Sequence, residues 1–131
     1  MNYFLDTDIC IYYLRGEQSV VDGICRLSPD RIKIPAIVQA ELMEGALTTR
    51  HPERSLEVIE SFCSPFETVP FCGQCAVHYG RIRHYLRVKG TMIGPNDLII
   101  AATVIAHHGM LITRNTREFN RVPDIKLYDL K

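Results

Sequence analysis

The chain opens with the stretch YFLDTDICIYYLRG (residues 3–16), in which a short apolar run gives way to a helical pattern. Residues 3–5 have the apolarity of a short buried strand, and this run stops at Asp6. Thr7 can cap the helix that follows, and Gly16 can stop it. The opening of the chain therefore predicts a strand, a turn and a helix in immediate succession.

The same alternation continues along the rest of the chain. Further strands are predicted at residues 31–34, 66–69, 110–113 and 126–128. Helices are predicted at residues 17–27, 36–47, 52–62 and 73–89, and from Gly94-Pro95 to a C-cap at Gly109, with a helical turn at 116–119. The helices at 36–47 and 52–62 should form a hairpin, and the helix after Pro95 should be buried because it has almost no polar face. Strands that alternate with helices predict an α/β sandwich around a mostly parallel central sheet.

The composition is that of an ordinary globular protein. The 131 residues are 47% hydrophobic and 23% charged, so we expect one domain over residues 1–131. Because 15 Lys and Arg balance 15 Asp and Glu, the net charge gives no long-range attraction to RNA, and any such contact must be local. No apolar run reaches the roughly 20 residues that span a bilayer, and no basic leader is visible. We therefore expect a cytoplasmic protein that makes no contact with a membrane.

The cysteines are odd in number and lie mostly within apolar helical patterns, which fits reduced thiols inside a cell. They are Cys10, Cys25, Cys63, Cys72 and Cys75. The Cys72-x-x-Cys75 spacing also suggests zinc binding or redox chemistry, but zinc would need two more ligands, and nearby His78 extends a helical pattern. We therefore expect no zinc or redox site here.

Two aspartates occupy positions that suit a functional site. Asp6 follows the first predicted strand, and functional groups gather beyond the carboxyl ends of the strands in an open parallel sheet. Asp97 lies in the first turn of the most apolar helix, where an isolated carboxylate would be desolvated. Each has a structural alternative, because an acidic group at a helix N-terminus gains roughly 0.3 to 2 kcal/mol as a simple cap. Position alone leaves both interpretations open.

A glutamate of the helix at 36–47 is a third candidate. Glu41 shares a helical sector with Ile37 and Val38, which indicates partial burial. Glu44 lies one turn further along the same sector. Periodicity cannot choose between the two glutamates.

Polar residues also follow the predicted strand at 110–113. Thr113, Asn115 and Glu118 should lie near the same edge of the sheet as Asp6. Carboxylates gathered there would repel one another unless a hard cation with oxygen ligands, Mg²⁺ or Mn²⁺, were bound. One such cation, or a pair about 3.5 to 4 Å apart, can lower the pKa of water for attack on phosphorus and stabilise the leaving oxygen. The chemistry indicated is phosphodiester hydrolysis.

Four short motifs carry a resemblance to a known family. They are LDT (residues 5–7), AEL (40–42), IGPND (93–97) and TRNTREF (113–119). Together they span nearly the whole chain and resemble the PIN-domain family, specifically VapC-type toxins. The resemblance implies a PIN-like α/β/α fold and an endoribonuclease that depends on Mg²⁺ or Mn²⁺. It also implies a homodimer, a larger complex with an inhibitory VapB-type antitoxin, and cleavage of tRNA, especially initiator tRNA, or of ribosomal RNA.

The resemblance also assigns the acidic site. Asp6, Glu41 and Asp97 match the three acidic positions of the family, which are catalytic and bind the metal. The AEL context favours Glu41 over Glu44, which periodicity had left open.

Two positions depart from the pattern of the family. Asp8 stands where related toxins commonly carry Asn, so it can add a negative charge beside the metal. Asn115 stands where many PIN domains have a fourth aspartate, which leaves Glu118 as a possible substitute among the catalytic residues. Whether Asn115 or Glu118 completes the site is left open.

Substrate binding should rely on local groups. Arg114 and Arg117 lie near the expected carboxylates and are the better candidates for phosphate contact, while the Thr113 hydroxyl could hydrogen-bond a water molecule there. The helix at 73–89 is also rich in basic residues, but a solvated helix surface is an equally good interpretation.

Two rival functions deserve comparison. Asp6-x-Asp8 also resembles the start of haloacid-dehalogenase-like phosphatases, where the first aspartate is a nucleophile and the second a general acid. That chemistry would need a downstream lysine and an acidic pair, and no convincing set is found. The other rival is a PIN-like module that binds RNA or protein without cleaving it, which Asn115 in place of an aspartate would allow. Metal-dependent cleavage of RNA distinguishes these functions.

Overall fold

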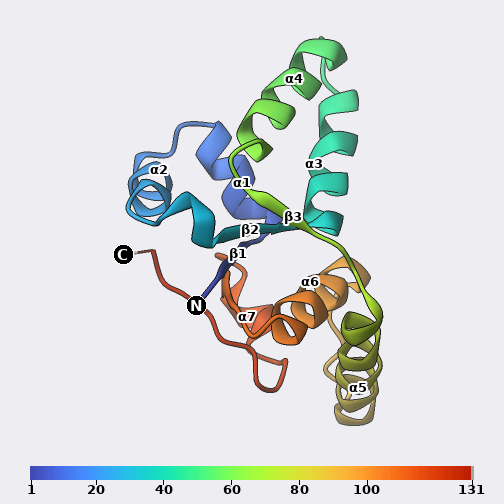
Figure 1. Ribbon diagram of the computed structural model, residues 1–131. Helices are drawn as coiled ribbons and strands as arrows, with labels where there is room; N and C mark the ends of the chain where they lie inside the picture. The colour runs from blue at the N-terminus through green and yellow to red at the C-terminus, as the bar shows by residue number, and fades with distance from the viewer. Residues whose placement is uncertain (131) are drawn as a thin grey trace.

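The computed structural model describes residues 1–130 as alternating strands and helices (Figure 1). The strands are β1 (Tyr3–Leu5), β2 (Ile32–Pro35), β3 (Glu67–Val69) and β4 (Met110–Ile112). The helices are α1 (Thr7–Leu14), α2 (Gln18–Cys25), α3 (Ala36–Leu47), α4 (Pro52–Cys63), α5 (Gly73–Lys89), α6 (Pro95–Ala106) and α7 (Thr116–Phe119), with a short 3-10 helix, η1 (Pro29–Arg31). None of the helices at residues 1–130 is long and apolar enough to cross a membrane.

The four strands form one parallel sheet in the order β3-β2-β1-β4. The central strand β1 pairs with both neighbours, so that Tyr3 faces Ile32 on one side and Met110 on the other. In the view of Figure 1, α1, α3 and α4 lie above the sheet and α5 and α6 below it. The predicted α/β/α sandwich with a parallel sheet is confirmed. The predicted α3–α4 hairpin is also present.

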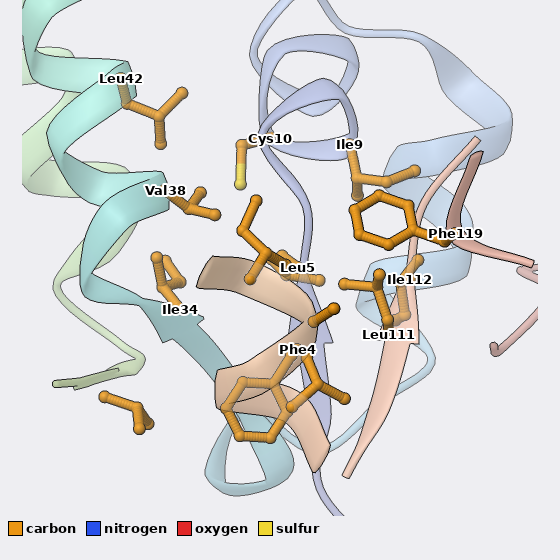
Figure 2. Close-up of a cluster of buried hydrophobic side chains, with 14 of the residues drawn as sticks. Phe4, Leu5, Ile9, Cys10, Ile34, Val38, Leu42, Leu111, Ile112 and Phe119 are labelled. Atoms are coloured by element: carbon orange, nitrogen blue, oxygen red, sulfur yellow. The ribbon is translucent and has the colours of Figure 1, made fainter. Parts of the chain in front are cut away.

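The core lies on both faces of the sheet. Phe4 and Leu5 are 1% and 0% exposed, and Figure 2 shows their side chains pointing to opposite faces of β1. A strand covered on both faces needs a continuous apolar run, which is what residues 3–5 supply. Helix α6 is buried as predicted, since Ile100 and Val104 are both fully covered.

Two helix ends differ from the prediction. Asp6, not Thr7, caps α1: its side chain accepts a 2.8 Å hydrogen bond from the Thr7 N–H, because Asp6 is the last extended residue before the helix. At the end of α6 the C-cap is His107, and His108 takes the positive φ of 54°. Gly109 is needed for space instead, because a Cβ there would lie 2.4 Å from Cε1 of Phe4.

The strands are also slightly shorter or shifted. Pro35 forms the end of β2, and β4 ends at Ile112. The strand predicted at 126–128 is only an isolated bridge, in which Leu127 pairs with Leu111. A single bridge with two backbone hydrogen bonds, at 2.8 and 2.9 Å, does not extend the sheet beyond β4. The carboxyl ends of β1 and β4 remain neighbours, so Asp6 and Thr113 meet at one edge.

Candidate active site

Asp6 is the most buried acidic residue at this edge, with only 5% of its surface exposed. One carboxylate oxygen accepts the Thr7 N–H at 2.8 Å, and the other accepts the Thr113 hydroxyl at 2.6 Å. Burial, with the charges of Asp8 and Asp97, outweighs these hydrogen bonds and raises the pKa of Asp6 from 3.8 to about 7. Asp6 is therefore a carboxyl whose negative charge its surroundings oppose near neutral pH.

Glu41 connects three helices at the same site. Its carboxylate accepts the Thr7 hydroxyl of α1 at 2.7 Å and the Asn96 side-chain amide of α6 at 3.2 Å. Glu44, one turn away, is exposed. The structure thus brings Glu41 to Asp6 and Asp97 and leaves Glu44 outside. The sequence analysis treated Thr7 only as a capping residue and gave Asn96 no role of its own, and the signal for a further role is that each adjoins a site aspartate.

Asp97 and Glu118 form an acidic pair. Burial, then the charges of Glu118 and Glu41, raise the pKa of Asp97 to about 6. Glu118 behaves oppositely: hydrogen bonds from the Asn115 amide at 2.8 Å and the Gly94 N–H at 2.9 Å lower its pKa. Since Glu118 keeps its charge more readily, a proton shared by this pair resides on Asp97. Asn115 and Glu118 therefore lie in the site together rather than as alternatives.

Asp8 adds a further carboxylate beside Asp6. One of its oxygens accepts the backbone N–H of Arg114 at 3.1 Å. The other, Oδ1, is buried and has no hydrogen-bond partner among the described residues. A buried, unpartnered carboxylate oxygen is costly, so this atom is one that a cation or an ordered water would stabilise.

The substrate-binding candidates differ in their surroundings. Thr113 lies within the site, where it donates to Asp6 and accepts the Asn115 N–H at 3.0 Å. The Arg114 guanidinium instead pairs with Glu17 and lies 4.5 Å from the centre of the Tyr12 ring, at the rim of the site. Arg117 is exposed on α7, one residue before Glu118.

The donor set suits a hard divalent cation. Asp6, Glu41 and Asp97 offer only oxygen ligands, the pKa of both aspartates is raised, and Asp8 Oδ1 has no partner. Yet within residues 1–130 no three acidic, His or Cys side chains lie close enough together to hold a metal as they stand. The carboxylates of Asp6 and Glu41 instead accept hydrogen bonds from Thr7, Thr113 and Asn96. The oxygen ligands therefore suit Mg²⁺ or Mn²⁺ in their chemistry, while the spacing of the side chains is not that of a formed metal site.

Comparison with known proteins agrees with this site. The PIN domain matches residues 3–125. The chain is 36% identical to the tRNA(fMet)-specific endonuclease VapC of Salmonella typhimurium over 129 residues, which cover 98% of both chains. It is also 36% identical to ribonuclease VapC2 of Rickettsia felis, covering 97% of this chain and 96% of that one.

Solved structures give the same result. A chain of the DNA-bound VapBC complex of Salmonella typhimurium superposes with a TM-score of 0.94 at 35% identity, covering 100% of this chain and 99% of that chain. A chain of VapBC2 from Rickettsia felis, bound to a promoter DNA fragment, has a TM-score of 0.92 at 35% identity, covering 98% of both. These matches leave no support for a phosphatase reading of Asp6-x-Asp8. The chain belongs to the PIN-domain family and, within it, to the VapC-type ribonucleases.

Proposed function

We propose that residues 1–131 form a single PIN domain that acts as the toxin of a VapBC toxin–antitoxin system, a metal-dependent endoribonuclease. The observation that carries this proposal is the convergence of Asp6, Glu41 and Asp97 at the carboxyl edge of the sheet, linked through Thr7 and other polar groups. Relatives named ribonuclease VapC, at about the same length, support the activity.

Mg²⁺ or Mn²⁺ is the proposed cofactor, and Asp6, Glu41 and Asp97 would hold it. Such a cation supplies Lewis-acid chemistry, which makes water a better nucleophile toward phosphorus and neutralises charge on the leaving oxygen. The raised pKa values of Asp6 and Asp97 support the proposal, because a bound cation would favour the charged forms that burial opposes.

The remaining polar groups of the site would orient the ligands. The Thr113 hydroxyl holds one oxygen of Asp6, and the Thr7 hydroxyl holds one oxygen of Glu41. We assign Glu118 as the fourth carboxylate, since it retains its charge next to Asp97. Asn115 then acts as a positioning residue, because its amide donates to Glu118 and cannot itself serve as an acid or base.

RNA is the proposed substrate, with initiator tRNA favoured over other tRNA or ribosomal RNA because two relatives are named as tRNA(fMet)-specific endonucleases. Arg117 is the better phosphate contact, since it is exposed beside Glu118. Arg114 would contribute after release from Glu17, to which it is now paired. Helix α5 carries basic but no acidic residues and could guide more distant phosphates.

A VapB-type antitoxin is the proposed partner, as in the VapBC complexes that resemble this fold. A groove of about 380 Å³ between α1, α3 and α4 is lined mostly by apolar side chains, such as Leu14, Leu42 and Val58, and includes Glu41. A partner segment seated there would lie against Glu41 and block access to this carboxylate. We further propose a cytoplasmic homodimer within the larger complex.

The test is cleavage of defined RNAs by the purified chain. Initiator tRNA, an elongator tRNA and ribosomal RNA are each incubated with Mg²⁺, Mn²⁺ or EDTA, and products are mapped by primer extension. We expect cleavage only with metal and a preference for initiator tRNA. Glu41→Gln should abolish it, while the matched control Glu44→Gln should retain it. Equal cleavage in EDTA, or an active Glu41→Gln variant, would refute the metal site, and tight RNA binding without cleavage would favour a non-catalytic module.

A further inference from the structure

A pair of thiols lies outside the acidic site, at the start of α5. The Sγ atoms of Cys72 and Cys75 are 3.5 Å apart, a contact between sulfurs that no other described pair of cysteines makes. A disulfide bond is about 2.05 Å long, so bond formation needs an approach of about 1.5 Å, which side-chain rotation can supply. The contact between the sulfurs therefore favours a disulfide between these two residues, although the sequence pattern predicted no redox site here.

The two thiols have different environments. Cys72 is exposed at the N-cap of α5, where the Cys75 N–H and thiol lower its pKa. Cys75 is 0% exposed, and burial raises its pKa. An exposed thiol that ionises readily is suited to attack, and a buried neighbour within reach is suited to resolve the product.

We propose that Cys72 and Cys75 form an oxidisable dithiol that reacts with low-molecular-weight disulfides such as oxidised glutathione. The Cys72 thiolate attacks one sulfur of the external disulfide, forms a mixed disulfide and expels one thiolate, which takes up a proton. Cys75 then loses its proton to solvent and attacks Cys72 Sγ, which forms the Cys72–Cys75 bond and expels the second thiolate. One external disulfide is reduced to two thiols, and the two protein thiols are oxidised.

The pair lies against α6 rather than among the acidic side chains. The Cys75 side chain hydrogen-bonds Thr103, which is six residues beyond Asp97, or about 9 Å further along the axis of α6. Within residues 1–130 the groups that hydrogen-bond the two thiols include no acidic side chain, so oxidation is expected to leave the basal cleavage rate unchanged. The proposal does not depend on the ribonuclease assignment, so either can fail alone.

Cys25 provides an internal control, because it is exposed but has no hydrogen bond to another thiol within residues 1–130. The folded protein is incubated with oxidised glutathione, trapped with an alkylating reagent and mapped by tandem mass spectrometry. In the unsubstituted protein we expect a Cys72–Cys75 disulfide, whereas Cys25 stops at the glutathione adduct. In Cys75→Ser, Cys72 should accumulate the adduct as Cys25 does, and in Cys72→Ser, Cys75 should stay reduced.

A kinetic measurement on the unsubstituted protein tests the proposal without relying on any variant. Alkylation of Cys72 should be faster than that of Cys25, because the lowered pKa of Cys72 increases its thiolate fraction by more than it reduces the nucleophilicity of the thiolate. Circular dichroism checks that each variant is folded. The proposal is overturned if Cys72 retains glutathione while Cys75 stays free in the unsubstituted protein, or if Cys72 reacts no faster than Cys25.

Discussion

Replacing Asp6 with Asn should stabilise the metal-free protein while destroying its active site. The pKa of Asp6 is raised from 3.8 to about 7, so at pH 8 the folded protein holds a charge that it disfavours. At about 1.36 kcal/mol per pKa unit, roughly three units correspond to at most about 4 kcal/mol. Asn is similar in shape, carries no charge and keeps an acceptor for the Thr7 N–H, but its amide nitrogen replaces the oxygen that accepts the Thr113 hydroxyl, which offsets part of this gain. We therefore expect Asp6→Asn to be more stable than the unsubstituted protein by about 2 to 4 kcal/mol at pH 8.

The stability difference between Asp6→Asn and the unsubstituted protein should depend on pH in a defined direction. Between pH 4 and 7 the folded state keeps a proton on Asp6 that the unfolded state has lost, so stability falls as the pH rises through this range and then levels off. The Asp6→Asn variant does not undergo this loss of stability, because its side chain does not titrate. Its advantage at pH 8 should therefore exceed its advantage at pH 5 by about 2 to 3 kcal/mol.

Urea unfolding followed by circular dichroism, with EDTA at pH 5 and pH 8, measures both quantities. Asp30→Asn is the matched control, because Asp30 is exposed and should change stability by no more than about 0.5 kcal/mol at either pH. If Asp6→Asn is less stable than the unsubstituted protein at pH 8, or if its advantage is the same at both pH values, the burial argument is wrong.

Further outcomes are expected from other parts of the structure. Gly109→Ala should destabilise the protein by about 1 to 3 kcal/mol in urea unfolding, because the new Cβ would meet the Phe4 ring. Gly45→Ala, which has open space around its Cβ, should stabilise the protein by about 0.5 to 1 kcal/mol. Equal effects of the two substitutions would contradict the close packing of Gly109 against Phe4. Saturating Mg²⁺, at 100 times its Kd, should stabilise the unsubstituted protein by about 2.7 kcal/mol, and an unchanged melting temperature would count against a metal site. Glu118→Gln should lower the pKa of Asp97 in a ¹³C NMR titration, because it removes a repulsive charge. Arg117→Ala should raise KM for RNA without changing the melting temperature, because Arg117 is exposed.

The order and type of most elements could be predicted because each depends on local patterns. The apolar run at residues 3–5 is too short and too continuous for an amphipathic helix, so a buried strand was the consistent prediction. The sequence of α6 is apolar on nearly all sides of the helix, and this pattern likewise predicted a buried helix. Family motifs placed Asp6, Glu41 and Asp97 together, where periodicity had left Glu41 and Glu44 equivalent.

The sequence by itself determined the alternation of strands and helices, and with it the sheet edge on which Asp6 and Thr113 lie, because hydrophobic spacing and turn chemistry act over a few residues. Only the tertiary structure decided which groups share a proton or a hydrogen bond. Glu118 lies beside Asp97 because the N–H of Gly94, 24 residues away in sequence, donates to it at the start of α6. Such partners depend on how α6 and α7 pack against the same sheet, and a pattern of residues along the chain cannot predict this packing.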